Sequence, residues 1–165
     1  MRILGIDPGS RCTGFGIIEV RGDRTVCISH GVIRTGGGEF PQRLGVIFSG
    51  VREVIRNHSP DQLAIESVFV SRNPASALKL GQARGAAICA AIAHDLPVAE
   101  YSPRSVKQAI VGRGGAEKAQ IKHMVAVLLQ LREEIEEDAA DALAVALCHQ
   151  HTQQTLQRMH QLQPT

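Results

Sequence analysis

The order of apolar segments along the chain restricts the possible folds more than any other feature of the sequence. Three β-branched, apolar runs come first, at residues 2–6, 13–20 and 25–34, and short turn signals separate them. Strands joined by short turns form an antiparallel meander. Helical periodicity then alternates with two further apolar runs, at 63–66 and 97–101. This order predicts a mixed five-stranded sheet flanked by helices, an α/β fold.

The chain of 165 residues has the length of a single domain. Helices are expected from residue 41, over 74–94, from 103, over 116–131 and from 136. We predict one domain over residues 1–150. A polar, glutamine-rich tail at 151–165 follows, and we expect it to fray.

Composition favours a cytoplasmic protein without membrane contact. Hydrophobic residues make up 44% of the chain and charged residues 21%, as in ordinary globular proteins. Apolar runs stay far below the ~20 residues that span a bilayer. The first residues also lack the pattern of a signal peptide.

The cysteines and two late histidines are expected to carry no chemistry. Cys12, Cys27, Cys89 and Cys148 lack CxxC spacing, so reduced core thiols are expected. His149 and His151 are expected at the surface, near a helix end.

Charge is distributed unevenly, although the net charge is only +2. Residues 67–132 carry nine Lys or Arg side chains and three Asp or Glu side chains. A basic segment on a near-neutral chain fits a polyanionic partner, for which nucleic acid is the usual candidate. A solvated basic face without a partner is the alternative.

Two carboxylates follow apolar runs directly. Asp7 ends the first run and Glu66 ends the fourth. Functional sites gather at strand ends in sheets of this kind. The alternative is that Asp7 serves only the Asp-Pro-Gly turn, and that Glu66 is simply the first exposed residue after its strand.

Two more carboxylates, Asp138 and Asp141, lie three residues apart on one helix face. The run at 142–147 is apolar throughout and predicts a buried helix. A buried carboxylate needs a proton, a cationic partner or a metal ion. The helix offers no Lys or Arg between Arg132 and Arg158. If the strand ends and this helix face converge, four oxygen donors suit Mg²⁺ or Mn²⁺, and two such ions would support phosphodiester hydrolysis.

Four motifs occur in a fixed order, at residues 5–10 with 13–14 (GIDPGS, TG), 65–66 (IE), 77–85 (ALKLGQARG) and 138–144 (DAADALA). Over about residues 2–150 the sequence resembles the RuvC family of crossover junction endodeoxyribonucleases, which resolve Holliday junctions. Proteins of the actin and sugar-kinase type open with a similar turn, but they need two domains, and 165 residues are too few.

The resemblance implies an RNase H-like fold whose four metal-binding, catalytic carboxylates are Asp7, Glu66, Asp138 and Asp141. It implies Mg²⁺, with Mn²⁺ as a plausible substitute, and two ions per site. It also implies a homodimer that nicks two DNA strands of like polarity at symmetric positions of a four-way junction. The setting is homologous recombination and DNA repair, with the branch-migration proteins RuvA and RuvB as partners.

The same resemblance places DNA contacts at Lys107 and Lys118, which would otherwise be read as solvated lysines. It favours Phe69 as a wedge at the junction centre, beside Arg72, although core packing is the commoner role of a phenylalanine.

Small residues in the segment 74–94 fit a helix contact across a two-fold axis. The resemblance puts Leu78, Gly81 and Gly85 in that contact. The alternative is that these small residues pack tightly on the protein's own sheet. Both interpretations apply if the helix uses one face for the sheet and the opposite face for the dimer.

Two other functions stay open. One is an RNase H-like nuclease that acts on RNA or RNA–DNA hybrids. The other is a catalytically silent junction-binding protein, which four clustered carboxylates argue against because negative charge weakens contact with DNA.

Overall fold

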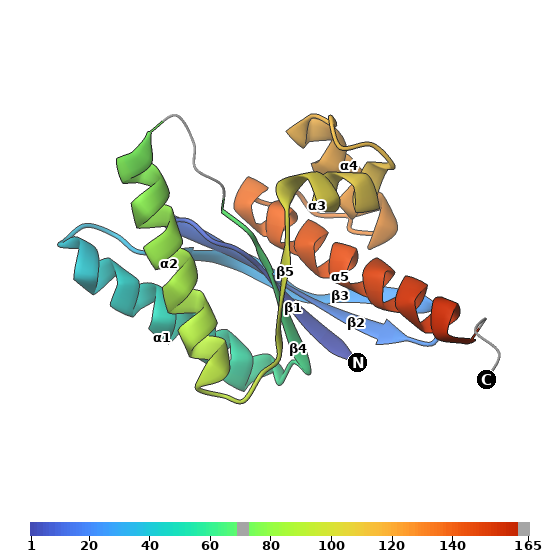
Figure 1. Ribbon diagram of the computed structural model, residues 1–165, viewed down its shortest axis with the longest axis horizontal. Coiled ribbons are helices and arrows are strands. Elements are labelled where there is room, and N and C mark those ends of the chain that lie inside the picture. The colour runs from blue at the N-terminus through green and yellow to red at the C-terminus, as the bar shows by residue number, and fades with distance from the viewer. Residues whose placement is uncertain (69–72, 162–165) are drawn as a thin grey trace.

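The computed structural model describes residues 1–68 and 73–161 (Figure 1). Its mixed sheet has the order β3-β2-β1-β4-β5. The central strand β1 pairs antiparallel with β2 and parallel with β4. The strands are β1 (Arg2–Asp7), β2 (Cys12–Arg21), β3 (Arg24–Arg34), β4 (Gln62–Glu66) and β5 (Val98–Tyr101). The predicted mixed sheet of five strands is confirmed, and each strand begins and ends within one residue of its expected position.

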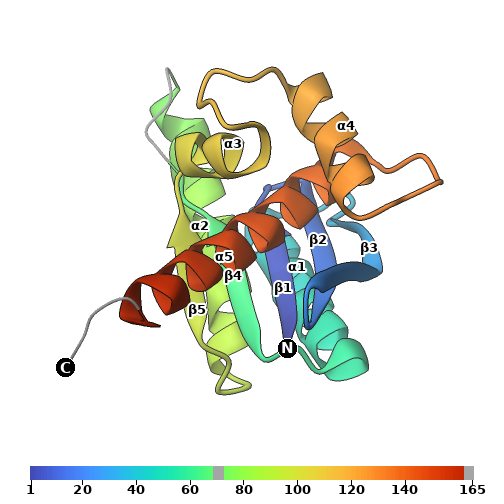
Figure 2. The same cartoon turned by 90° about the vertical axis from the view of Figure 1, so that its right-hand side faces the viewer.

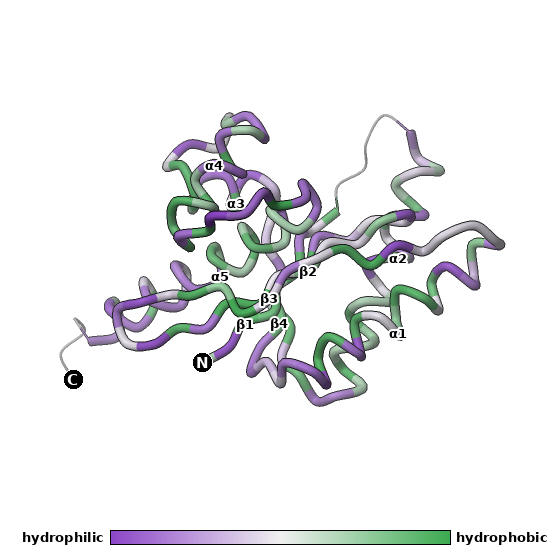
Figure 3. Tube along the Cα trace, turned by 180° about the vertical axis from the view of Figure 1, so that it is seen from behind, coloured by the Kyte–Doolittle hydropathy of each residue, from purple (hydrophilic) through white to green (hydrophobic). Residues whose placement is uncertain are grey.

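The described residues form five helices, which lie on the two sides of the sheet. They are α1 (Phe40–His58), α2 (Pro74–Ile92), α3 (Pro103–Val111), α4 (Lys118–Leu128) and α5 (Glu137–Gln161). Figures 1 and 2 show α1 and α2 on one face and α5 crossing the other, with α3 and α4 beyond it. In Figure 3, α1 alternates between hydrophobic and hydrophilic residues along its length, as expected of a helix that covers a sheet with one side.

The alternation of side chains along β1 separates two hydrophobic cores. Leu4 and Ile6 are fully buried on the side of α1 and α2. Ile3 is fully buried in the other core, against α5. Because both faces are covered, β1 carries no polar side chain between Arg2 and Asp7, which explains its uninterrupted apolar run.

Two glycines let α5 lie directly against the strand backbones. A Cβ atom added at Gly5 would overlap the carbonyl oxygen of Ala142, and one added at Gly14 would overlap that of Asp138. The first turns of α5 are therefore seated on β1 and β2, close to the end of β1.

The expected fraying after residue 151 is wrong for residues 152–161. Helix α5 continues without interruption to Gln161. Within this stretch the Thr152 hydroxyl donates a hydrogen bond to the carbonyl oxygen of Cys148, one turn earlier (2.8 Å). The exposed turns carry mostly polar residues, so they show no apolar periodicity from which a helix is predicted. The domain boundary at residue 150 stays a prediction.

The expected surface position of His149 is also wrong, since its side chain is buried (2% exposed). The four cysteines are free, as expected. Cys148 is buried, whereas Cys89 is exposed on α2, so the core assignment fails for Cys89. In the part of the chain that the structure describes, no helix has the length and apolar character needed to cross a bilayer.

Replacing Gly5 with alanine is expected to destabilise the protein by about 3 kcal/mol or more, because the new methyl group overlaps backbone atoms of α5 that cannot rotate away. Urea unfolding measures the loss. Gly45→Ala is the matched control: a Cβ there meets no atom within 4 Å, and alanine stabilises a helix interior by up to about 1 kcal/mol relative to glycine. Equal stability of Gly5→Ala and the original protein would contradict the close contact.

Candidate active site

The topology brings the ends of β1 and β4 to one edge of the sheet. Ile6 pairs with Ile65 in parallel register, so the next residues, Asp7 and Glu66, end their strands side by side. Both belong to the set of alternating positions that faces α5. Asp141 lies one turn into α5. Three predicted carboxylates, from two strands and one helix, therefore meet between the sheet and α5.

These side chains line a cavity of about 240 Å³. Its walls are formed by Asp7, Glu66, Asp141, Lys107 and Lys118, together with Pro103, Val106 and Ile121. Asp138 lies outside this lining, but its charge still raises the pKa of Asp7 and of Asp141. All four predicted carboxylates thus belong to one electrostatic cluster.

Burial and mutual repulsion make the cluster reluctant to ionise. Burial, together with the charges of Glu66, Asp141 and Asp138, raises the pKa of Asp7 to about 8. Burial also raises the pKa values of Glu66 and Asp141. A cation placed among these carboxylates would relieve both the desolvation and the repulsion.

Lys118 supplies positive charge from the first position of α4. Its Nζ lies 2.7 Å from Glu137 Oε1 and 3.5 Å from Asp141 Oδ2. The hydrogen bond to Glu137 is the main cause that raises the pKa of Lys118, so the ammonium stays charged. Sequence reasoning missed the role of Glu137, because an acidic run at the start of a helix is already explained by the helix dipole.

The carboxylates are neighbours, but they do not converge on one point. Among residues 1–68 and 73–161, no group of three Asp, Glu, His or Cys side chains is placed so that it could hold a metal ion. The donor set nevertheless fits Mg²⁺ or Mn²⁺ chemically, because it is acidic, oxygen-only and partly buried.

Arg84 supports the site from the opposite face of the sheet. Its Nε donates to the carbonyl oxygen of Glu66 (3.3 Å), and its guanidinium forms an ion pair with Glu100 on β5. The bond fixes the backbone at the end of β4. Helical periodicity gave no sign of this role, and only the position of Arg84 within the ALKLGQARG motif marks it.

The predicted DNA-binding residues differ in what the structure shows. Lys107 and Lys118 both reach the carboxylate cavity, and their charges lower the pKa of Glu66 against the effect of burial. Phe69 and Arg72 lie outside the described residues.

Helix α2 turns its two faces to different environments. Alanines at Ala83, Ala87, Ala90 and Ala91 are buried in the core shared with α1. On the other side Leu78 is 70% exposed, and a Cβ added at Gly81 or Gly85 would meet no atom within 4 Å. Gly81 and Gly85 therefore do not pack on the protein's own sheet, and this face is open.

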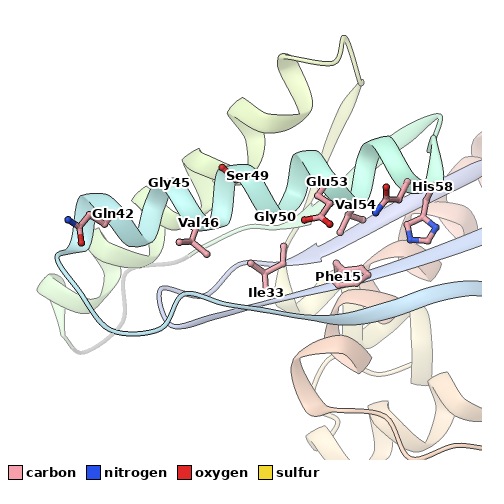
Figure 4. Close-up of a pocket in the computed structure, with 11 residues that line it drawn as sticks. Phe15, Ile33, Gln42, Gly45, Val46, Ser49, Gly50, Glu53, Val54 and His58 are labelled. Atoms are coloured by element: carbon pink, nitrogen blue, oxygen red, sulfur yellow. The ribbon is translucent and has the colours of Figure 1, made fainter.

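A cavity of about 730 Å³ lies between α1 and the strands β2 and β3 (Figure 4). Its lining is mainly apolar, including Phe15, Ile33 and Val46, with Glu53 and His58 toward one end. Its lining contains a single carboxylate, Glu53, and no lysine, unlike the smaller cavity. The charged lining, and not the volume, therefore marks the smaller cavity as the candidate active site.

The sheet order, the helix that crosses the sheet, and the acidic cluster at the ends of β1 and β4 define a protein of the RNase H-like α/β class. A family model described as crossover junction endodeoxyribonuclease RuvC matches residues 3–149. The chain belongs to the RuvC family.

Individual relatives agree with this assignment. The crossover junction endodeoxyribonuclease RuvC of Shewanella amazonensis is 56% identical over 154 residues, which cover 93% of this chain and 89% of the relative. The RuvC of Burkholderia cenocepacia is 55% identical over 164 residues, covering 99% and 91%. The solved structure of T. thermophilus RuvC in complex with a Holliday junction substrate superposes with a TM-score of 0.87 at 35% identity, covering 94% of this chain and 96% of that one. The yeast mitochondrial resolvase Ydc2 shares only the fold, with a TM-score of 0.68 at 13% identity, covering 94% and 82%.

Replacing Asp7 with asparagine is expected to stabilise the metal-free protein at alkaline pH. The pKa of Asp7 rises from 3.8 to about 8 on folding, so the native state holds this proton more tightly, and stability falls as pH rises between these values. At pH 8.5 the full cost is present, on the order of a few kcal/mol. Asp7→Asn removes this cost, and the resulting gain in the free energy of unfolding should become smaller toward pH 5.

Urea unfolding in a chelator at both pH values measures this gain. Glu53→Gln, an exposed change on α1, is the control and should leave stability unchanged at either pH. A variant Asp7→Asn that is no more stable than the original protein at pH 8.5 would show that Asp7 ionises at little cost.

Proposed function

We propose that this chain is a metal-dependent endonuclease that resolves Holliday junctions by paired, symmetric nicks in two strands of like polarity. Membership of the RuvC family supports the reaction class. The observation that carries the proposal is the cavity in which Asp7, Glu66 and Asp141 meet two lysines. Clustered carboxylates oppose DNA binding unless cations neutralise them, so this arrangement favours metal-assisted cleavage over simple binding.

Asp7, Glu66, Asp138 and Asp141 are the proposed ligands, and two Mg²⁺ ions, or Mn²⁺ in their place, are the proposed cofactors. When bound, such ions activate a water molecule and stabilise the departing oxygen of a phosphodiester. The chain supplies ligands whose pKa values are raised, so cation binding displaces protons. Among the described residues, no three of these side chains are placed to hold an ion. Metal binding therefore requires the carboxylates to move closer together.

Lys107 and Lys118 are proposed to contact DNA phosphates at the mouth of the site. Both lysines line the carboxylate cavity. Lys118 also has Glu137 as a second anionic partner. When cations neutralise Asp141, Glu137 keeps Lys118 beside the cavity, where it can attract the phosphate backbone.

The open face of α2 is proposed to form a homodimer, because symmetric cuts need two sites held in fixed relation. Its apolar Leu78 and its two glycines allow another helix to approach closely. The structure of T. thermophilus RuvC with a Holliday junction supports four-way DNA as the substrate. RuvA and RuvB are the proposed partners in the cytoplasm.

A cleavage assay tests the reaction. The purified protein is offered a synthetic four-way junction and a linear duplex of the same sequence, each with Mg²⁺ and with a chelator. We expect paired nicks in the junction only, dependent on Mg²⁺. Asp7→Asn should lower the rate by a factor of about 100 or more, since a metal ligand is lost, while Glu53→Gln should cleave normally.

The other outcomes separate the alternatives. Tight junction binding without cleavage would favour a silent junction-binding protein. Equal cutting of the linear duplex would retain the nuclease and remove the junction specificity. Preferred cutting of an RNA–DNA hybrid would favour a different RNase H-like nuclease.

Replacing Leu78 with glutamate is expected to convert the dimer to a monomer, because a charge would be buried in the centre of the proposed contact. In a monomer, Leu78 is exposed, so folding should be unaffected. Sedimentation measures the mass. Met159→Glu, at another exposed apolar residue on α5, should stay dimeric, and a Leu78→Glu variant that also stays dimeric would place the contact elsewhere.

A further inference from the structure

A partly buried polar network joins α5 to the start of β4 and to the end of β5. The Tyr101 hydroxyl is 2.7 Å from His149 Nδ1, and His149 Nε2 is 2.6 Å from Gln62 Oε1. The Tyr101 and His149 rings also meet edge to face, with centroids 5.6 Å apart. Three residues from β4, β5 and α5 are thereby joined in one chain of hydrogen bonds.

The protonation state of this network follows from its partners. Gln62 Oε1 is an acceptor, so His149 Nε2 carries the hydrogen and donates it. His149 Nδ1 is then an acceptor, and the Tyr101 hydroxyl donates to it. Burial lowers the pKa of His149, which favours this neutral ring. Every polar atom of the ring therefore has its partner.

The bond between His149 and Gln62 and the carboxylate cavity lie at opposite ends of the contact between α5 and β4, while Tyr101 pairs with Glu66 in the sheet. Along β4, Gln62 and Glu66 lie on the same side, about 13 Å apart. Along α5, Asp141 and His149 are separated by about 12 Å. Because His149 lies against Gln62, and Asp141 and Glu66 line one cavity, the helix and the strand run in opposite directions with nearly equal spacing.

The contacts between these two ends are apolar and small, and include Ala64 and Ala144. The contacts at Gly5 and Gly14 place the first turns of α5 on β1 and β2, whereas small apolar contacts specify the position of α5 along β4 only weakly. The hydrogen bond between His149 and Gln62 is directional and partly buried, so it weakens when α5 slides along β4.

We infer that the network of Tyr101, His149 and Gln62 sets the position of α5 along β4 and thereby holds Asp141 opposite Glu66. His149 is a positioning residue in this arrangement, since it acts through Asp141 and does not reach the cavity. The inference rests on the proposed function, because it gives the separation of Glu66 and Asp141 its catalytic meaning.

The test compares two neighbouring buried residues of α5. His149→Leu removes the bond to β4. Gln150→Leu is the matched control: Gln150 is also buried, and its amide donates to Thr25 Oγ1 on β3 (2.6 Å), away from β4. His149→Leu removes two hydrogen bonds, to Gln62 and to Tyr101, and Gln150→Leu removes one, so the first variant should lose more stability. Only the first should disturb the site.

The first readout is Mg²⁺ affinity, measured by calorimetry on the free protein. His149→Leu should weaken it about 10-fold, the size of effect expected when a residue supporting a metal ligand is lost. Gln150→Leu should change the Mg²⁺ affinity less than about 2-fold, because Gln150 makes no contact with β4 and should not couple to the metal ligands. His149→Gln places an amide nitrogen near the position of Nε2 and should restore most of the affinity, because the bond to Gln62 is kept.

The second readout needs no metal. In amide NMR spectra recorded with a chelator, His149→Leu should shift the signals of Glu66 and Asp141, whereas Gln150→Leu should leave them in place. If both variants affect Mg²⁺ affinity and these signals equally, the network has only a general stabilising role and the inference is wrong.

The two readouts keep this inference separate from the proposed function. If the original protein binds no Mg²⁺, the proposed metal site fails, and the NMR comparison alone decides whether His149 positions α5. Normal Mg²⁺ affinity and unshifted signals in His149→Leu would overturn the inference while leaving the nuclease intact.

Discussion

The contact between α5 and the backbones of β1 and β2 is the constraint on which the rest of the structure depends. Gly5 and Gly14 remove the side chains that would separate them, and carbonyl oxygens of the helix occupy the space. This contact places the first turns of α5 over the end of β1. Asp138 and Asp141 therefore lie near Asp7, and both belong to the helix itself and not to a long loop. A catalytic group on a packed helix is held more firmly than one on a loop.

The same contact creates an electrostatic problem. Three partly buried carboxylates line one small cavity, and burial together with repulsion raises the pKa of Asp7 to about 8. Lys118 offsets part of this cost from α4, yet it is shared with Glu137 and lies 3.5 Å from Asp141. Because Lys118 pairs more closely with Glu137 than with Asp141, it neutralises only part of the negative charge of the carboxylates. The proposed cations would neutralise the remainder. Ionising these carboxylates without a cation therefore costs stability, as expected where function and stability compete.

The sequence predicted the sheet and the proximity of Asp7, Glu66 and Asp141, for physical reasons that apply locally. Apolar runs and turns mark strands directly, and Asp141 stands out because its own helix contains no cationic partner. The lysine that approaches it comes from α4, and no periodicity links two helices across a loop. His149 was assigned to the surface because the polar residues after it resemble a helix end, whereas α5 continues to Gln161. Its partners, on β4 and β5, are distant in sequence and become visible only in the folded chain.

The two faces of the sheet carry different parts of the proposed activity, and few direct bonds connect them. On one side α5 and the lysines of α3 and α4 surround the carboxylates. On the other, α2 packs its alanines on α1 and leaves Leu78 and two glycines open. Arg84 joins the two sides, because it belongs to α2 and donates to the carbonyl oxygen of Glu66. The end of β4 is thus fixed from both faces. A chain this short can combine a partly buried acidic site with an open helix face because each face of the sheet has its own core.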